Sequence, residues 1–247
     1  MLVLLPPSET KADGGAGPPL DLHALSFPEL SQVRSRLVSA LESLAADVPA
    51  SLAALGLSER QAGEVARNAA LRHCATLPAV ERYTGVLYDA LGIASFTRAE
   101  RRRAGGRLAV TSALFGVLRA ADPIPAYRLS GGSTLPGIGG LRGIWHPVLS
   151  KTLSTVDDLM LDLRSGPYAA LARVPHAITV RVVGEDAAGR RVAVSHLNKA
   201  YKGRLAAALA RAPREPGTVR AVMRLAGLAG LRLEPAGERV LDLVADK

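Results

Sequence analysis

The stretch from Ser112 to Leu129 constrains the fold most, because its character changes twice within eighteen residues. Its first part is apolar, and the segment Asp122-Pro-Ile-Pro then excludes a helix from passing through. An aromatic and a basic residue, Tyr127 and Arg128, follow almost directly. We expect the apolar part to be buried and to fix the position of a polar tip that can meet a ligand.

Length and patterning predict a globular chain with a core of its own. Of the 247 residues, 48% are apolar and 21% are charged. A chain of this length buries enough surface to need no disulfide or metal. Helical and strand patterns alternate without a clean βαβ repeat. We therefore predict an α/β (mixed α+β) fold in one domain over residues 1–247, with a mixed sheet and surrounding helices.

Apolar periodicity predicts where the main elements lie. Strands are expected at residues 2–5, 108–111, 158–163, 178–183, 191–194, 231–233 and 240–244. Helices are expected at residues 27–44, from 58 onward, and at 79–91, 145–153, 198–211 and 218–228. Ser58 is expected to cap its helix together with Gln61, and residues 185–189 to form a hairpin turn.

Cysteine content and apolar runs predict the compartment. The chain has a single cysteine, Cys74, so no disulfide forms within it and a reducing compartment is indicated. The apolar run at residues 1–5 is too short for a signal peptide, and no run is long enough for a membrane helix. We expect a cytoplasmic protein with no membrane partner.

The charge balance allows a polyanionic partner. Lys and Arg outnumber Asp and Glu by 31 to 22, which gives a net charge of +9 and a pI near 10.3. This balance favours nucleic acid or a phosphorylated small molecule, or it reflects a solvated basic face. The densest basic run, residues 98–107, is expected on a helix. There a solvated face is the commoner outcome and a phosphate-binding patch the rarer one.

Several kinds of site are not indicated by the sequence. There is no P-loop and no glycine fingerprint for a dinucleotide. The five histidines lack metal-ligand spacing, and His73 beside Cys74 suits neither a zinc site nor a catalytic pair. We expect neither a metal nor a cofactor.

The segment Leu135–Gly139 matches the hairpin of a helix-hairpin-helix, whose glycines let backbone N–H groups approach a DNA phosphate. The residues before it, Gly131-Gly132-Ser133, are typical of a turn rather than of a first helix. A plain loop is therefore the favoured interpretation, and the DNA-binding hairpin is the alternative.

Polar residues follow the first expected strand. Ser8, Thr10 and Lys11 emerge beyond its carboxyl end, which is where ligands bind in open α/β sheets. The two hydroxyls can donate to phosphate or carboxylate oxygens, and Lys11 can neutralise one. A solvated turn capped by these hydroxyls explains the same residues equally well.

These blocks resemble the YaaA family of bacterial peroxide-stress proteins. The match includes Ser8, Thr10 and Lys11, the block Tyr83–Leu91, and most strongly the stretch Ser112–Leu129. It continues in order through Trp145, Ser165 and Tyr168 to the segment 195–203, which holds Lys199 and Lys202. The resemblance implies a mixed α/β fold of its own type, DNA binding through a basic cleft, and a role in limiting iron-linked oxidative damage.

Two classes of function remain. The first is a DNA-binding stress protein whose Arg and Lys residues contact phosphates with little base readout. The alternative is an enzyme that acts on a nucleobase, a nucleotide or a similar small anionic metabolite, because polar and aromatic residues from distant matching blocks would converge in a pocket. That pocket is expected to be lined by Ser8, Lys11, Arg119, Tyr127, Arg128 and Lys199, with Arg119, Tyr127 and Arg128 in one wall. The residues expected to bind ligand or phosphate are Ser8, Thr10, Lys11, Tyr88, Arg119, Tyr127, Arg128, Trp145, Ser165, Tyr168, Lys199 and Lys202.

Catalytic roles are assigned only as candidates. Asp89 or Asp122 can serve as a general base, and Ser8 or a tyrosine can orient the leaving group. Lys11 is the remaining catalytic candidate. A structural interpretation stands beside each: Tyr127 and Trp145 as core residues, and Asp122 as the local cap of the break made by the proline that follows it.

Overall fold

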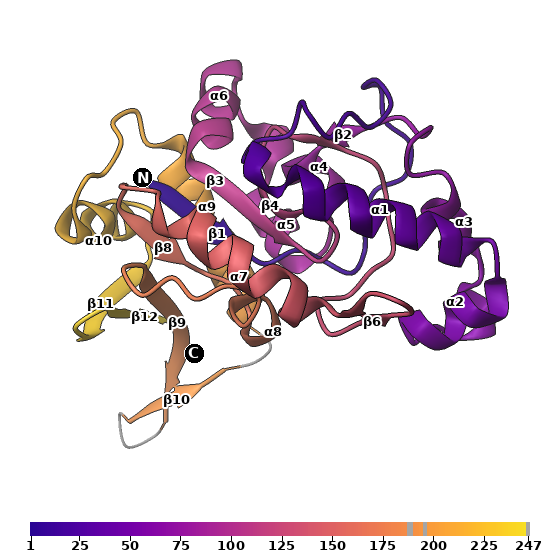
Figure 1. Ribbon diagram of the computed structural model, residues 1–247. Coiled ribbons are helices and arrows are strands. Elements are labelled where there is room, and N and C mark those ends of the chain that lie inside the picture. Colours follow the sequence, from indigo (N-terminus) through magenta and orange to yellow (C-terminus); the bar gives the residue numbers. More distant parts are fainter. Residues whose placement is uncertain (187–189, 195–196, 246–247) are drawn as a thin grey trace.

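One mixed sheet forms the centre of the molecule (Figure 1). The computed structural model describes residues 1–186, 190–194 and 197–245. The strands pair in the order β11-β12-β9-β8-β1-β3-β4, and β10 pairs with β9. Their bounds are β1 (Leu2–Leu5), β3 (Leu108–Ser112), β4 (Gly116–Arg119), β8 (Met160–Asp162), β9 (Ile178–Glu185), β10 (Arg191–Ala193), β11 (Arg232–Gly237) and β12 (Val240–Val244).

Strand β1 lies in the middle of the sheet, and all four of its residues are completely buried. An all-apolar run of this kind is typical of a parallel strand covered on both faces. β1 runs parallel to β3 on one side and to β8 on the other, and Leu4 is level with both Ala109 and Asp162. The chain thus adds β3 on one side of β1 and β8 on the other. At such a switch point the carboxyl ends of the strands open a crevice.

The remaining pairings extend the sheet to its two edges. β8, β9 and β12 continue in parallel, and the outer strands β4, β10 and β11 are antiparallel to their neighbours. Ion pairs brace the β9–β10–β11 edge, where Arg191 and Arg232 each contact both Glu185 and Glu234. The predicted hairpin joins β9 to β10, and residues 187–189 of its turn lie outside the described chain.

Helices cover the sheet and fill both ends of the molecule. They are α1 (Ser31–Ala45), α2 (Val48–Leu55), α3 (Gly63–Ala69), α4 (Ala79–Arg82), α5 (Val86–Leu91), α6 (Arg98–Arg107), α7 (Leu141–Ser154), α8 (Gly166–Ala169), α9 (Asn198–Arg211) and α10 (Val219–Leu228), with 3-10 turns at Pro28–Leu30, Glu59–Gln61 and Ile93–Ser95. In Figure 1, α1, α2 and α3 lie at the right-hand end, whereas α10, β11 and β12 lie at the left-hand end.

The mixed α/β fold is confirmed, but two predicted helices differ from the observed ones. The helix expected at 79–91 is two short helices, because residues 83–85 leave helical geometry and Gly85 has a φ of +93°. The capping box of Ser58 with Gln61 is confirmed, but it opens a 3-10 turn, and helix α3 begins only at Gly63.

The apolar part of the stretch 112–129 is a tight β-hairpin. Ser112 pairs with Gly116, so β3 turns directly into β4, a strand that the sequence pattern did not separate. Gly116 has a φ of +77°, and a Cβ there would lie 2.7 Å from the Trp145 ring. The position therefore requires glycine on grounds of both backbone conformation and space.

The segment Leu135–Gly139 forms a small antiparallel hairpin. β6 (Thr134–Leu135) pairs with β7 (Gly139–Gly140), and α7 follows at once. The described chain from 125 to 133 contains no helix, so no first helix directly precedes the hairpin. A second short antiparallel pair joins β2 (Leu77–Pro78) to β5 (Pro123–Ile124). β5 follows directly after Asp122.

Candidate functional site

The carboxyl ends of β1 and β8 bring two polar loops to one edge of the sheet. Residues 6–11 follow β1, and residues 163–168 follow β8. Tyr88 on α5 closes the first loop, because its hydroxyl donates to the Pro6 carbonyl at 2.8 Å. An isolated antiparallel β-bridge between Lys11 and Tyr83 connects the same loop to the chain between α4 and α5. The break at residues 83–85 therefore serves the site, because it supplies this bridge.

Lys11 is buried beneath this loop, with 7% of its surface exposed. Its Nζ donates to the Ser8 carbonyl at 3.1 Å and to the Glu9 carbonyl at 3.2 Å. It also lies 4.2 Å from the centre of the Tyr127 ring and 5.5 Å from that of Tyr83. The side chain that the sequence placed on a polar turn is thus held inside the protein.

Burial lowers the pKa of Lys11 from its usual 10.5 to about 7, because the charged form loses its hydration. The Glu9 carboxylate opposes this change, and the Arg128 guanidinium adds to it. A substantial fraction of Lys11 is therefore the neutral amine near neutral pH. Such a group can act as a base or as a nucleophile.

The rings of Tyr83 and Tyr127 lie beside Lys11, and their hydroxyls hydrogen-bond to each other. The hydroxyls of Tyr83 and Tyr127 lie 2.8 Å apart, and Ser112 is 2.8 Å from that of Tyr127. Tyr168 accepts a hydrogen bond from the Gly131 backbone at 3.2 Å. Burial raises the pKa of each of these tyrosines, that of Tyr168 to about 12. All three hydroxyls therefore keep their protons at neutral pH and can donate them in hydrogen bonds.

Arg128 provides the cation at the rim of the site. The side chain of the buried Asn68 accepts from the Arg128 N–H at 2.7 Å and donates to the Arg128 carbonyl at 2.9 Å, which fixes the backbone. The guanidinium Nη1 lies 3.4 Å from the Glu9 carboxylate. Asn68 was not predicted, and nothing local in the sequence marks it, because its role depends on a partner 60 residues away.

Three hydroxyls converge beside Lys11. Ser8 and Thr10 are 3.2 Å apart, and Thr84 donates to Thr10 at 3.0 Å. A Cβ on Gly85 would lie 3.4 Å from the Ser8 hydroxyl, so the glycine leaves room around this group. These hydroxyls offer donors to an anionic ligand.

The β8 side contributes a second buried lysine. Lys202, on α9, is 7% exposed, and its Nζ donates to the Arg164 carbonyl at 3.4 Å. Burial lowers its pKa, and the Asp162 carboxylate opposes the change. Arg164 pairs with Asp162 through two hydrogen bonds of 2.9 and 2.7 Å. Ser165 is exposed and is the N-cap residue directly before α8.

Other predicted residues lie away from this cluster. Arg119 pairs with Ala109 near the start of β3, and its guanidinium donates to the Gly106 carbonyl at 2.5 Å. It therefore does not share a wall with Tyr127 and Arg128, which corrects the expected arrangement. The cause is that β4 carries the chain back to the start of β3 at Arg119, whereas Tyr127 hydrogen-bonds to Ser112 at the carboxyl end of β3.

Trp145 and Asp122 take structural positions. Trp145 is completely buried, and its indole N–H donates to the Ala113 carbonyl at 2.8 Å. Asp122 accepts from the Arg119 backbone at 2.9 Å and from the backbone and hydroxyl of Ser26 at 3.1 and 2.7 Å. Asp122 thus caps the turn and anchors the N-terminal loop.

Asp89 and Lys199 are exposed. Asp89 lines a pocket of about 360 Å³ on the outer side of α5, together with Tyr88 and Thr84. Lys199 stands in the first turn of α9. Lys199 lies outside the Lys11 cluster, whereas the pocket of Asp89 is also lined by Tyr83, whose ring lies beside Lys11.

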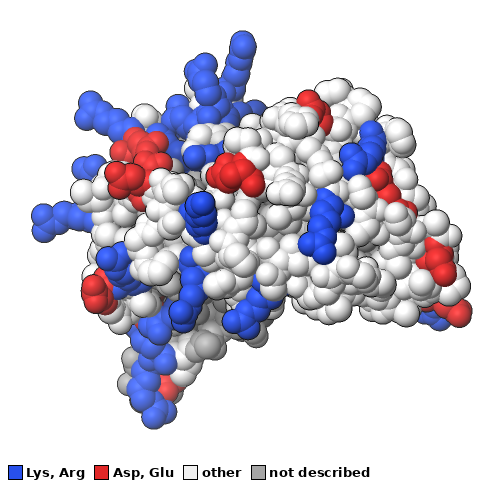
Figure 2. Space-filling model, in the orientation of Figure 1, with Lys and Arg blue, Asp and Glu red and all other residues white. Residues whose placement is uncertain are grey.

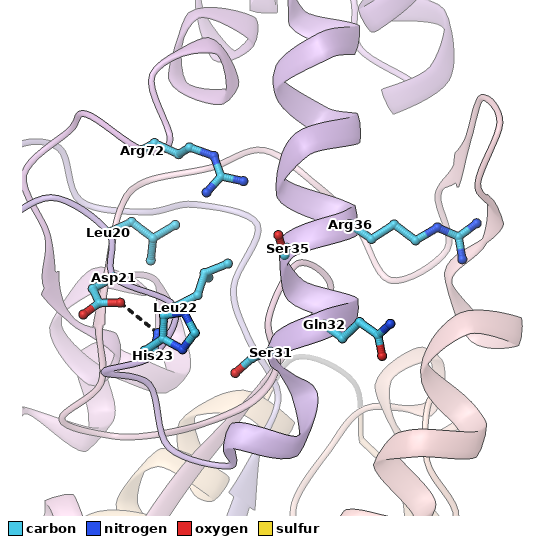
Figure 3. A pocket seen from close by; sticks show the side chains of 9 residues that line it. All are labelled: Leu20, Asp21, Leu22, His23, Ser31, Gln32, Ser35, Arg36 and Arg72. Atoms are coloured by element: carbon cyan, nitrogen blue, oxygen red, sulfur yellow. Dashed lines mark hydrogen bonds between the residues drawn. The ribbon is translucent and has the colours of Figure 1, made fainter.

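A larger pocket opens between α1 and the N-terminal loop (Figure 3). It holds about 740 Å³ and is lined by residues 20–23, by polar residues of α1 and by Arg72. Arg72 is held by Glu42 at 3.0 Å, and Figure 3 shows Arg36 pointing away from the pocket. It shares no lining residue with the Lys11 cluster, and no sequence motif pointed to it.

Helices α6, α9 and α10 carry a basic face. Figure 2 shows Lys and Arg side chains projecting over the region that α6 and α10 occupy in Figure 1. Eight exposed cations on these helices and the loop before α10 have no ion pair within the described chain: Arg98, Arg102, Lys199, Arg204, Arg211, Arg214, Arg220 and Arg224. We call these residues the basic face.

The carboxylates near the basic face are already engaged. Glu215 contacts the N-terminal amine and lies 3.5 Å from Arg107, and Glu100 completes the cap of α6 with Thr97. A groove of about 430 Å³ between residues 212–217 and α10 is lined by Arg214 and Arg224. The basic face therefore keeps most of its positive charge.

Among the described residues, no group of three or more His, Cys, Asp or Glu side chains is arranged to hold a metal ion. None of the helices in the described ranges is both long and apolar enough to cross a membrane.

The chain is similar in sequence to a known protein family. The family model for peroxide stress protein YaaA matches residues 1–235. A UPF0246 protein of Corynebacterium efficiens is 50% identical over 238 residues, which is 95% of each chain. A UPF0246 protein of Corynebacterium glutamicum is 46% identical over 250 residues, which cover 99% of this chain and 100% of that protein. One of Streptomyces coelicolor is 46% identical over 217 residues, which cover 85% of this chain and 82% of that protein.

Proposed function

The chain belongs to the family of peroxide stress protein YaaA, and from this premise we propose that it binds the phosphate backbone of DNA through the basic face. We propose also that this binding limits iron-linked oxidative damage to the DNA. A cytoplasmic location, where DNA is accessible, accompanies this function. The distribution of unpaired cations is the observation that carries the proposal.

The β9–β10–β11 edge and the basic face differ in whether their arginines are paired with carboxylates. At the β9–β10–β11 edge, Arg181, Arg190, Arg191 and Arg232 all contact carboxylates. The cations of the basic face contact none among the described residues. Only cations that are not already neutralised release DNA counterions when they meet phosphates. The basic face is therefore the surface at which a duplex gains most.

The proposal predicts how salt affects binding. Each phosphate that a cation neutralises adds about 0.9 to the slope of log K against log salt concentration. The variant Arg220→Ala/Arg224→Ala is expected to reduce this slope by about 2, measured by fluorescence anisotropy with a short duplex. Base sequence is expected to matter little, because phosphate contacts carry no sequence information.

Arg36→Ala/Arg60→Ala is the matched control, since it removes the same charge from exposed positions on α1 and the turn before α3. It is expected to leave the slope within experimental error of the wild type. An equal effect of both variants would show that net charge alone drives binding. Absence of binding at low salt would refute the proposal outright.

Protection of DNA can be tested directly. Supercoiled plasmid exposed to ferrous iron and hydrogen peroxide is expected to be nicked more slowly when the wild-type protein is present. The basic-face variant is expected to lose this protection together with binding, because a bound protein shields only the DNA it contacts. Equal protection by both proteins would separate the protective effect from DNA binding.

A second candidate function is an enzymatic or binding role on a small anionic ligand, such as a nucleobase, a nucleotide or a similar metabolite. It is favoured by the burial of Lys11 beside Arg128 at the sheet's switch point. The test is a thermal-shift screen against nucleotides and small carboxylates. A stabilising compound whose effect is lost in Arg128→Leu supports this role, since binding to the folded state alone raises the melting temperature.

A further inference from the structure

We propose that Lys11 is a nucleophilic amine that forms an imine with a small oxoacid, a compound carrying a carbonyl group next to a carboxylate. This inference rests on the second candidate function, because it names the substrate class and the chemistry of that site. It is independent of DNA binding by the basic face.

The hydrogen bonds of Lys11 leave its lone pair free. A neutral amine has two N–H groups and one lone pair, and Lys11 has two acceptors, the carbonyls of Ser8 and Glu9 at 3.1 and 3.2 Å. When both N–H groups are used in this way, tetrahedral geometry directs the lone pair away from the two carbonyls. The loop thus holds the nitrogen in an orientation suited to attack on a carbonyl carbon.

Among the described residues no carboxylate forms an ion pair with Lys11, and those of Glu9 and Glu64 favour its charged form only through longer-range attraction. The nearest acidic residue in sequence is Glu9, and its carboxylate is directed to Arg128 at 3.4 Å rather than to Nζ. Among described groups, the polar partners of Nζ are carbonyls and the faces of two tyrosine rings. A desolvated lysine near another cation is the arrangement in which proteins activate amines for imine formation.

Glu9 and Arg128 indicate the second functional group of the substrate. The Glu9 side chain is 46% exposed, whereas that of Arg128 is 19% exposed and fixed by Asn68. An ion pair this exposed contributes little, so an incoming carboxylate can replace Glu9 on the guanidinium. Glu9 therefore stands in for the substrate's carboxylate, and the carbonyl to be attacked belongs on the side nearer Lys11.

The reaction balances without a further reagent. The lone pair of Nζ forms a bond to the carbonyl carbon, and the carbonyl π electrons move to the oxygen, which takes a proton from the nitrogen. Loss of that hydroxyl with the remaining N–H proton, as one water, forms the C=N bond. One amine and one carbonyl compound give one imine and one water.

Reductive trapping with glyoxylate tests the inference. The full-length protein is incubated at pH 7.5 with glyoxylate and sodium cyanoborohydride, and each lysine is followed by peptide mass spectrometry. The chain has five lysines, Lys11, Lys151, Lys199, Lys202 and Lys247, so each can be assigned. At this pH the neutral fraction of Lys11 exceeds that of an ordinary lysine by roughly a thousandfold, and after allowance for its restricted access we expect labelling about tenfold faster than at exposed Lys199.

Two comparisons define the substrate class. Arg128→Leu is expected to slow glyoxylate labelling of Lys11 about tenfold more than it slows labelling by acetaldehyde, in line with the loss of one charged hydrogen-bonding partner for the carboxylate. Acetaldehyde, which has no carboxylate, reports the part of the change that comes from the higher pKa of Lys11 once the neighbouring cation is gone. Lys202 is the internal control. Its side chain is buried to the same extent as that of Lys11, but its Nζ donates to the Arg164 carbonyl and not to the loop that contacts Arg128. Circular dichroism spectra and melting temperatures establish that the variant is folded.

The outcomes separate the inference from the function on which it rests. Labelling of Lys199 as fast as Lys11, or equal labelling of Lys11 by glyoxylate in wild type and Arg128→Leu, overturns the inference. If oxalate, which cannot form an imine, stabilises the wild type but not Arg128→Leu and Lys11 stays unlabelled, the imine is refuted and the anion site stands. If neither stabilisation nor labelling occurs, both are refuted.

Discussion

Replacing Lys11 with methionine is expected to stabilise the folded state. Methionine keeps the length and flexibility of the lysine stem and removes its charge. Lowering the pKa from 10.5 to about 7 means that the folded state disfavours the charged amine. At about 1.4 kcal/mol for each tenfold change in proton affinity, burial of the ammonium costs at most about 5 kcal/mol.

The substitution also removes favourable contacts. Two carbonyl acceptors, those of Ser8 and Glu9, lose their donor, at about 1 kcal/mol each because the loop is near solvent. The stacking of the charge on the Tyr127 ring is lost as well, worth about 1 kcal/mol. The net expectation for Lys11→Met is a gain of about 1–2 kcal/mol in the free energy of unfolding at pH 7, from the balance of these magnitudes.

The pH dependence gives the sharper result. Below pH 7 the amine is protonated in both states, so the cost of its burial is constant. Between pH 7 and 10.5 the unfolded chain holds a proton that the folded chain has released, so the stability of the wild type rises with pH. The advantage of Lys11→Met should therefore shrink by up to about 1.4 kcal/mol per pH unit across this range.

Urea unfolding of both proteins at several pH values between 6 and 10 provides the measurement, with fluorescence of Trp145 as the probe. The control is Lys199→Met, which alters an exposed lysine and should give no pH-dependent difference. If Lys11→Met is destabilised at pH 7 and the difference does not change up to pH 10, Lys11 is a charged structural group, and the reasoning on its burial is refuted.

Three further substitutions probe the fold and the rim of the site. Gly203→Ala is expected to destabilise the protein by several kcal/mol, because the new Cβ would lie 2.2 Å from the Leu87 carbonyl; a urea midpoint equal to that of the wild type would show that α5 and α9 can separate freely. Asp122→Ala should cost about 2–4 kcal/mol through its three lost hydrogen bonds while leaving DNA binding unchanged by anisotropy, and a binding defect in the folded variant would contradict its structural role. Asn68→Ala should free the Arg128 backbone and reduce the rise in melting temperature that small carboxylates produce, by more than it lowers the melting temperature of the ligand-free protein. A larger loss in the ligand-free protein would show that Asn68 serves stability alone.

The sequence predicted the elements that local pattern determines. β1 was predictable because four apolar residues followed by two prolines favour a short buried strand with a loop beyond it. The cap of Ser58 with Gln61 was predictable because both partners lie within one turn. The helix expected at 79–91 failed because its break is set by a distant partner: the Thr84 N–H pairs with the Thr10 carbonyl at 3.2 Å.

The candidate site was predictable only in part for the same reason. Ser8, Lys11, Tyr127 and Arg128 come together as expected of residues near strand ends. Arg119 does not, because it pairs with Ala109 near the start of β3, whereas Tyr127 contacts Ser112 at the other end of that strand. The burial of Lys11 could not be foreseen either, since it depends on Tyr83 and Tyr127 folding over the loop.

Buried arginines and buried lysines have different roles in this protein, because the arginines hold the fold together and the lysines can take part in chemistry. Buried arginines fasten backbone segments: Arg34 donates to the carbonyls of Ser26, Phe115 and Val117, and Arg82 to four others.

A guanidinium keeps its proton in any such environment, so these residues can only hold the fold together. An ammonium can release its proton when it is desolvated. The chain has five lysines among 31 basic residues, and two of them, Lys11 and Lys202, are buried at the carboxyl edge of the sheet. Proton or imine chemistry in this protein is therefore expected at this edge, and the exposed arginines of the basic face remain available for phosphate.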